Sequence, residues 1–186
     1  MSRAPGSPSP AGAPRRQPRR TPDEARIIER FKRLAPQQAA LKLATAPYCD
    51  DNGQFDRARW TEAFDSQRPD DIRDVKAVTG LYEGLVNHLV EMLHVAARLR
   101  GLEVVMRNDR PSGPELFWAA GDDGGLTSNQ VDVLKRLYGM RNDLQHASPG
   151  VQASEVYDDI LLLTKTLGRF AKSYIEWLQR HDISVI

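Results

Sequence analysis

One short segment of the 186-residue chain combines side chains that can act on a phosphodiester. It runs from Arg141 to His146 and reads RNDLQH. A guanidinium stabilises the negative charge that develops on a phosphoryl group, and an imidazole takes or gives a proton near pH 7. The amide of Asn142 can hold the phosphate or the imidazole by hydrogen bonds. The segment therefore predicts phosphoryl chemistry, and RNA cleavage is the reaction that needs these two groups.

The asparagine makes this motif rarer by chance than an arginine and a histidine at the same spacing alone. With 20 arginines and four histidines in the chain, an arginine and a histidine separated by four to six residues are expected about once by chance. Requiring asparagine directly after the arginine lowers that expectation to about 0.03. The same tripeptide recurs at residues 107–109, where no histidine follows at a suitable spacing.

The spacing also predicts where the two side chains point. Arg141 follows Leu137 by four residues and therefore projects from the apolar side of its helix, where a charge is costly without a partner or a function. His146 lies about 140° further round an ideal helix, so the two can face one groove if the helix ends between them. Residues 147–150, which include proline and glycine, predict that end. The alternative is structural: Arg141 pairs with Asp143 or a carboxylate of a neighbouring helix, and His146 is favoured by the helix dipole.

The rest of the chain predicts an all-α protein. Apolar residues recur at steps of three and four, and helix-capping residues or prolines separate the segments. The predicted helices lie near residues 22–34, 36–46, 55–66, 70–100, 128–148 and 154–181. Within residues 102–127, where the pattern breaks, Leu102–Met106 and Glu115–Ala119 are candidates for a small hairpin. The three longest helices predict an antiparallel bundle, with extra short helices before it.

This organisation divides the chain into three parts. Residues 1–20 contain five prolines, five arginines and no acidic residue, a composition typical of a disordered tail. Residues 21–66 are expected to form an N-terminal helical extension, and residues 67–186 the bundle domain.

Composition excludes several classes of protein. The net charge is +1 for the whole chain, but it is −4 without the arginine-rich tail. No apolar run is long enough to span a membrane, and the N-terminus lacks the apolar region of a secretory signal. Cys49 is the single cysteine, so no intramolecular disulfide is possible. His88 and His94 are six residues apart, on different sides of a helix. We therefore expect a soluble, cytoplasmic protein without a metal or other cofactor.

The RNDLQH segment, near the end of the penultimate helix of an all-α domain, resembles the Arg-x4–6-His motif of the HEPN superfamily. The resemblance covers about residues 70–181. It implies a metal-independent endoribonuclease that is a homodimer with two motifs in one cleft, and attack on the phosphate by the ribose 2′-hydroxyl. It also implies that Arg141 and His146 are catalytic with support from Asn142. Such a protein would act as a toxin or an antiphage effector, with a possible cognate antitoxin or regulatory protein as partner.

Two arginines, Arg107 and Arg110, are candidates for binding the RNA backbone, although exposed loop arginines often bind nothing. A second hypothesis remains open. The same bundle could be a non-catalytic dimerisation, nucleotide-binding or partner-binding module in which Arg141 holds an anion, and the charge of −4 favours that hypothesis.

Three further groups of residues have a structural interpretation. Lys135 and Arg136 are expected on the solvated face of their helix. Residues 122–123 are expected in a solvated turn, and Gly139 is expected to permit close packing between helices.

Overall fold

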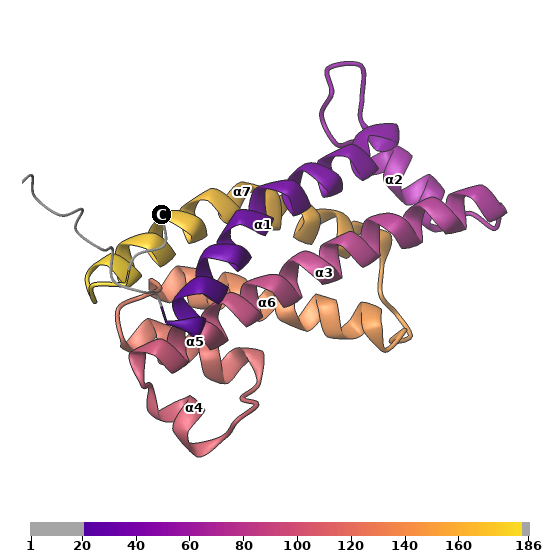
Figure 1. Ribbon diagram of the computed structural model, residues 1–186. Coiled ribbons are helices and arrows are strands. Elements are labelled where there is room, and N and C mark those ends of the chain that lie inside the picture. The colour runs from indigo at the N-terminus through magenta and orange to yellow at the C-terminus, as the bar shows by residue number, and fades with distance from the viewer. Residues whose placement is uncertain (1–20, 184–186) are drawn as a thin grey trace, which may run out of the picture.

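The computed structural model describes residues 21–183, and this part of the chain is all-helical (Figure 1). The predicted fold class, a helical bundle, is confirmed. Between residues 21 and 183, seven α-helices follow one another, with a single 3-10 turn after the first. They are α1 (Pro22–Thr45), η1 (Ala46–Tyr48), α2 (Arg57–Phe64), α3 (Pro69–Arg100), α4 (Glu103–Arg107), α5 (Gly113–Asp122), α6 (Ser128–Gln145) and α7 (Ala153–Gln179).

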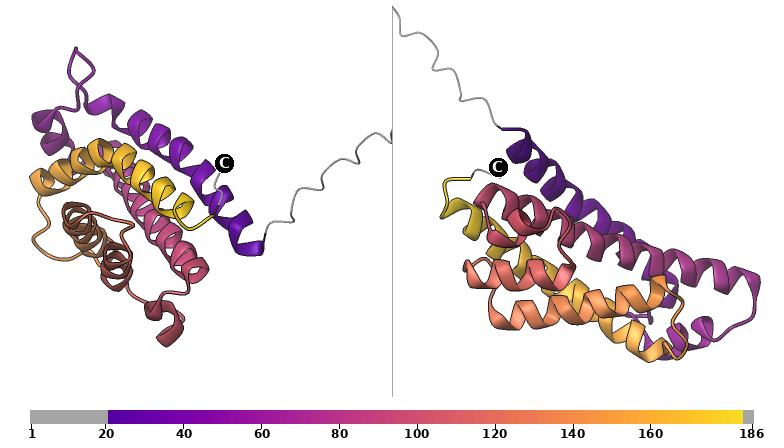
Figure 2. Two further views of the ribbon diagram at one scale, coloured as in Figure 1. Left: turned by 90° about the vertical axis from the view of Figure 1, so that its left-hand side faces the viewer. Right: turned by 90° about the horizontal axis from the view of Figure 1, so that it is seen from below.

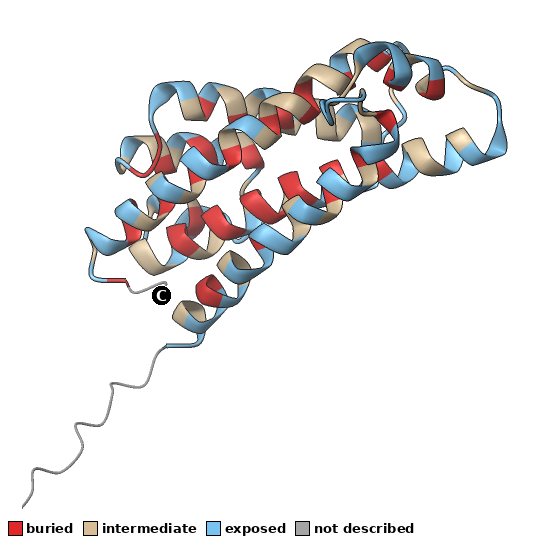
Figure 3. Cartoon of the chain, turned by 90° about the horizontal axis from the view of Figure 1, so that it is seen from above, coloured by how far each residue is buried: buried red, intermediate tan, exposed pale blue. Residues whose placement is uncertain are grey.

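The long helix α3 is the centre of the bundle. Helix α1 packs along one side of it, while α5 and α6 pack on another (Figures 1 and 2). Helix α7 contacts both α6 and α2. The last helix therefore packs against elements from both halves of the chain. The buried residues of each helix face inward and the outer faces are exposed (Figure 3).

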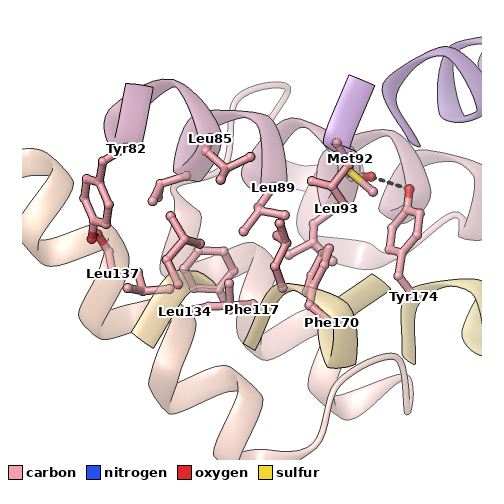
Figure 4. Packing of buried hydrophobic residues seen from close by; sticks show 14 of the residues in the cluster. Tyr82, Leu85, Leu89, Met92, Leu93, Phe117, Leu134, Leu137, Phe170 and Tyr174 are labelled. Carbon is pink, nitrogen blue, oxygen red and sulfur yellow. Dashed lines mark hydrogen bonds between the residues drawn. The ribbon is translucent and has the colours of Figure 1, made fainter. Parts of the chain in front are cut away.

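Leucines and aromatic residues of α3, α5, α6 and α7 fill the core (Figure 4). Two buried tyrosines also bond to the backbone of other helices. The hydroxyl of Tyr82 donates to the carbonyl oxygen of Leu137 at 2.9 Å, and that of Tyr174 donates to the carbonyl oxygen of Met92 at 2.9 Å. Because a buried hydroxyl without a partner is costly, these bonds favour one packing of α3 against α6 and α7.

The two predicted short helices at 22–34 and 36–46 are one helix of 24 residues, so the prediction that the N-terminal helices are all short is wrong. Pro36 lies inside α1 and has no N–H to donate to the preceding turn. The proline ring is exposed, while Leu34 and Leu41 on either side of it are buried against α3. His88 of α3 adds a hydrogen bond of 2.6 Å from its Nε2 to the carbonyl oxygen of Arg30. Tertiary packing thus outweighs the local cost of the proline.

The predicted hairpin within residues 102–127 is also wrong. Leu102–Met106 lies in and next to the short helix α4, and Glu115–Ala119 is part of α5. Helix α5 begins at a capping box, in which Ser112 and Glu115 bond reciprocally, and Pro114 stands in its first turn. These are helix-start features, and they explain why the segment forms a helix despite its prolines.

The other long helices form as their patterns predict. Gly101 ends α3 in the left-handed conformation, with φ of 64°. Thr127 and Gln130 form the predicted capping box of α6, and the apolar stripe of α7 is buried from Val156 to Trp177. The start of α3 is an exception, because Ile72 is 37% exposed there. None of the helices between residues 21 and 183 has both the length and the apolar character that crossing a membrane requires.

The predictions for residues 1–20 and for the last three residues lie outside the part of the chain that the structure describes.

Candidate functional site

The last turn of α6 and the residue that follows it hold all three residues of the predicted catalytic motif. Helix α6 ends at Gln145, so the prediction that it ends between Arg141 and His146 is confirmed. His146 is the C-terminal cap, and Ala147 turns the chain away with a positive φ of 47°. Because the N–H of His146 still bonds to the carbonyl oxygen of Asn142, as in a regular helix, its Cα keeps a helical position, and the chain turns away from the helix only at Ala147.

Asn142 is bonded to both of the other residues. Its side-chain oxygen accepts a hydrogen bond of 2.7 Å from Nη1 of Arg141. Its main-chain oxygen accepts the N–H of His146 at 3.0 Å. The first bond orients the guanidinium through the asparagine side chain, whereas the second is the ordinary backbone bond of the last helical turn, which any residue at position 142 would accept.

The guanidinium of Arg141 lies beside an aromatic ring and not beside an acid. Its central carbon is 5.6 Å from the ring centroid of Tyr138, which in turn packs edge-on against Phe117 of α5. Its Nε atom is buried and has no acceptor within residues 21–183. In that same part of the chain no carboxylate pairs with Arg141. A buried donor without an acceptor is unusual, but this Nε has almost no accessible surface, so the capacity of Arg141 to bind an anion depends on the exposed part of its guanidinium.

The side chain of His146 is exposed, and within the described residues its ring makes no hydrogen bond. No group within residues 21–183 fixes its tautomer or its orientation. The imidazole is therefore accessible to a ligand at the end of α6.

The two predicted substrate-binding arginines lie outside this turn of α6. Arg110 is in the loop that leads into α5, and an added Cβ at Gly113, three residues later, would lie 2.7 Å from Cε2 of Tyr138. That loop thus approaches the same side of α6 as Arg141. Arg107 ends α4 and pairs with Glu103. Both arginines are exposed.

Arg136 is exposed, as predicted, but it also pairs with a buried carboxylate of another helix. Its Nε donates to Oδ1 of Asp159 on α7 at 2.5 Å, and the side chain of Asp159 is 2% exposed. Burial raises the pKa of the Asp159 carboxyl above its ordinary value, although the hydrogen bond from Arg136 acts in the opposite direction. The sequence contained a signal for the burial of Asp159, because it stands three residues after Val156 and four before Leu163 on the buried stripe.

Of the two residues expected in a solvated turn, Asp122 is exposed, but Asp123 is largely covered, which corrects that half of the prediction. Asp123 accepts hydrogen bonds of 2.9 and 3.1 Å from the guanidinium of Arg100 and one of 2.9 Å from the indole of Trp177. Burial alone would raise its pKa, but the bonds from Arg100 and Trp177 outweigh that effect and lower the pKa. This cluster joins α3, α5 and α7 away from the predicted motif.

The structure also bears on the predictions for Lys135 and Gly139. Lys135 lies 5.0 Å from the ring centroid of Trp118, which is a cation–π contact across the α5–α6 pair. Gly139 does not permit close packing, because an added Cβ there would meet nothing within 4 Å. Within residues 21–183, no three histidine, cysteine or acidic side chains gather in a way that could hold a metal ion.

Comparison with protein-family models, with curated proteins and with solved structures gives no match to this chain.

Proposed function

We propose that this chain is an endoribonuclease that cleaves RNA without a metal ion, with Arg141 and His146 as its catalytic residues and Asn142 in support. The observation that supports it is the state of Arg141. A half-buried guanidinium bonds to a neutral amide, packs beside Tyr138, and retains a buried Nε–H that has no acceptor in the described chain. Because no carboxylate within residues 21–183 pairs with this guanidinium, its exposed part is available to a phosphate oxygen.

The proposed reaction is an internal displacement at phosphorus. The ribose 2′-oxygen forms a bond to phosphorus as its proton leaves to a base, and the bond from phosphorus to the 5′-oxygen breaks as that oxygen gains a proton. The products are a 2′,3′-cyclic phosphate and a 5′-hydroxyl. The imidazole of His146 makes one of the two proton transfers. The guanidinium of Arg141 stabilises the charge on the pentacoordinate phosphorus.

A second copy of the chain supplies the group that makes the second proton transfer. One imidazole cannot accept a proton from the 2′-hydroxyl and at the same moment supply one to the 5′-oxygen. A homodimer that places two α6 ends at one groove would provide a base and an acid. The same proposal includes this dimer and the assignment to a HEPN-like group. It also includes a role as a toxin or antiphage effector with a cognate inhibitor.

RNA would reach the motif along the α4–α5 side of α6. Arg110 is exposed in the loop that leads to Gly113 and Tyr138, so it is the better placed of the two candidate phosphate-binding arginines. Arg107 already pairs with Glu103 and would contribute less. Because residues 21–186 have a net charge of −4, binding would depend on this local site, and it would weaken with salt in proportion to the few phosphates that these arginines contact.

The test is cleavage of single-stranded RNA in EDTA by four purified forms of the chain. These are the wild type, Arg141→Ala, His146→Ala and the matched control Arg169→Ala, which removes an exposed arginine from α7. We expect the first two variants to lose about 100-fold or more in rate, the scale of a catalytic acid or base. Circular dichroism checks that each variant is folded. Wild-type rates in both motif variants, or loss of activity in chelator, would contradict the proposal.

A second candidate function has one observation in its favour. Because no group in the described part of the chain orients the His146 ring, the motif also fits a non-catalytic module in which Arg141 binds an anion such as a nucleotide phosphate. That module would bind a nucleotide saturably, lose the binding in Arg141→Ala but not in His146→Ala, and leave RNA intact.

A further inference from the structure

A groove between α4 and α5 combines carboxylates with an exposed tryptophan. It has a volume of about 540 Å³. Trp118 is 54% exposed at its edge, whereas the other two tryptophans, Trp60 and Trp177, are fully buried. Four carboxylates and one guanidinium line the groove, so its character is acidic. They belong to Glu103, Glu115, Asp122, Asp123 and Arg107.

The charges of the groove disfavour RNA and favour a cationic ligand. Asp123 is bonded to Arg100, Glu103 pairs with Arg107, and Glu115 caps α5. Asp122 makes no side-chain hydrogen bond or ion pair within the described residues. A phosphate backbone would be repelled by this set. An arginine would be attracted to the carboxylates and could stack on the indole, as Lys135 already does at 5.0 Å.

The chain contains a segment with that chemistry. Residues 14–20 read PRRQPRR, with four arginines, two prolines and no acid. Proline-rich segments bind to grooves lined by aromatic side chains at a low cost in conformational entropy, and arginines add pairing with carboxylates. The composition of this segment complements the groove in both respects.

The segment also ends close to the groove. Asp23, in the first turn of α1, lines a common hollow with Val105 and Met106 of α4, and it lies 3.7 Å from Arg98 at the end of α3. Figure 1 shows α4 below the start of α1. The α4–α5 groove is lined by other residues of the same short helix. Seven extended residues span about 25 Å, and a helix is about 10 Å across, so residues 14–20 can pass around α4. Met106, 77% exposed, lines the hollow on that path.

We propose that residues 14–20 of the same chain bind in the α4–α5 groove, with prolines and arginines against Trp118 and arginines paired with Asp122 and its neighbours. This interaction is independent of the RNA-cleaving function proposed above. The bound segment covers the exposed face of Trp118.

Trp118 reports on this binding in the full-length chain, because the other two tryptophans are buried. Quenching of its fluorescence by acrylamide is compared between the wild type and a variant with Arg15, Arg16, Arg19 and Arg20 changed to serine. Lys135 already lies over one face of the Trp118 ring, so the bound segment would cover the face that remains open, and we expect the variant to be quenched at least about twice as strongly at low salt. The difference should disappear at 0.5 M salt because screening weakens the ion pairs.

One further variant tests whether the segment binds in this groove, and another serves as a control for the change of charge. Asp122→Arg should raise quenching as the tail variant does, because it reverses the charge of the groove. The matched control changes Lys42 and Lys165, two exposed lysines on α1 and α7, to serine and should behave as wild type. Equal quenching in wild type and tail variant would overturn the proposal, as would a difference that persists in Trp118→Phe. A difference that grows with protein concentration would overturn it too, because it would indicate binding to a second copy.

Discussion

The guanidinium of Arg141 donates a hydrogen bond of 2.7 Å to the side-chain oxygen of its neighbour Asn142. An amide orients a guanidinium without neutralising it, whereas a carboxylate would do both. The arginine therefore keeps its full charge and a fixed direction. The alternative expected from the sequence, an ion pair with Asp143 or a carboxylate of another helix, is not formed within residues 21–183.

The first prediction concerns this amide. Asn142→Asp keeps the shape of the side chain but adds a charge that pairs with Arg141. We expect RNA cleavage to fall by about tenfold or more, because the guanidinium then has less capacity to stabilise a phosphorane. Cleavage assays at constant salt measure this. Asn129→Asp, the same change in the first turn of α6, should leave the rate unchanged, and equal rates for both variants would contradict the role of Asn142.

The second prediction concerns the pair between Arg136 and Asp159. Arg136→Met leaves a buried carboxylate without its partner, and we expect the free energy of unfolding to fall by about 2 kcal/mol at neutral pH. Urea unfolding measures it. The double variant Arg136→Met with Asp159→Asn should recover part of the loss, since the uncompensated charge is then gone.

The pH dependence of that loss follows from the direction of the Asp159 shift. Burial holds the pKa of this carboxyl above its unfolded value, so its charged form is the costly one in the folded state. As pH falls through the folded pKa, the carboxyl takes up a proton and the penalty disappears. The deficit of Arg136→Met should thus be largest at pH 7 and shrink toward pH 4. A deficit that stays constant over this range would contradict a buried charge as its cause.

The third prediction concerns His88, which joins α3 to α1. Burial lowers the pKa of its imidazole, although the hydrogen bond to Arg30 acts in the opposite direction. Arg33 and Arg30 disfavour the proton as well, while Glu91 favours it. A group whose pKa is lower in the folded state stabilises the fold above its unfolded pKa, and this contribution is lost as pH falls through the folded pKa.

We therefore expect the wild type to lose stability between pH 7 and pH 5 more steeply than His88→Gln, whose amide can donate to Arg30 but does not titrate. Urea unfolding at several pH values compares the slopes. Parallel curves would show that His88 does not contribute to the acid sensitivity.

The fourth prediction uses two glycines as a matched pair. An added Cβ at buried Gly125 would lie 2.4 Å from Cδ2 of Trp177, whereas one at Gly139 in α6 would meet nothing within 4 Å. Gly125→Ala should destabilise the protein by about 1–3 kcal/mol through overpacking. Gly139→Ala should stabilise it by about 0.5–1 kcal/mol through helix propensity. Thermal unfolding of both variants checks the signs, and a stabilising Gly125→Ala would contradict the packing at Trp177.

The amino-acid pattern predicted the long helices well because their information is local. Thr127 and Gln130 cap α6, Gly101 ends α3, and the stripe of α7 has a regular step. The prediction failed at Pro36, where burial of Leu34 and Leu41 against α3 keeps α1 intact. Such packing depends on residues far away in sequence and is not visible in the segment itself.

The candidate site was predictable in part for the same reason. The positions of Arg141, Asn142 and His146 follow from helix spacing and from the end of α6. The contacts of Arg141 with Asn142 and Tyr138 are local, at separations of one and three residues. Asp159, in contrast, meets Arg136 across two helices. Although its place on the apolar stripe indicated burial, nothing local identified its partner.

The most direct test of the proposed reaction is the chemistry of the new RNA ends. Single-stranded RNA and the same sequence with 2′-O-methyl riboses are incubated with the full-length chain in EDTA, and the products are analysed by mass spectrometry. We predict 2′,3′-cyclic phosphate and 5′-hydroxyl ends from the RNA, no cleavage of the methylated strand, and no products from His146→Ala. Cleavage of the methylated strand, products with 5′-phosphate ends, or unchanged products from His146→Ala would contradict the role of the 2′-hydroxyl and of this histidine.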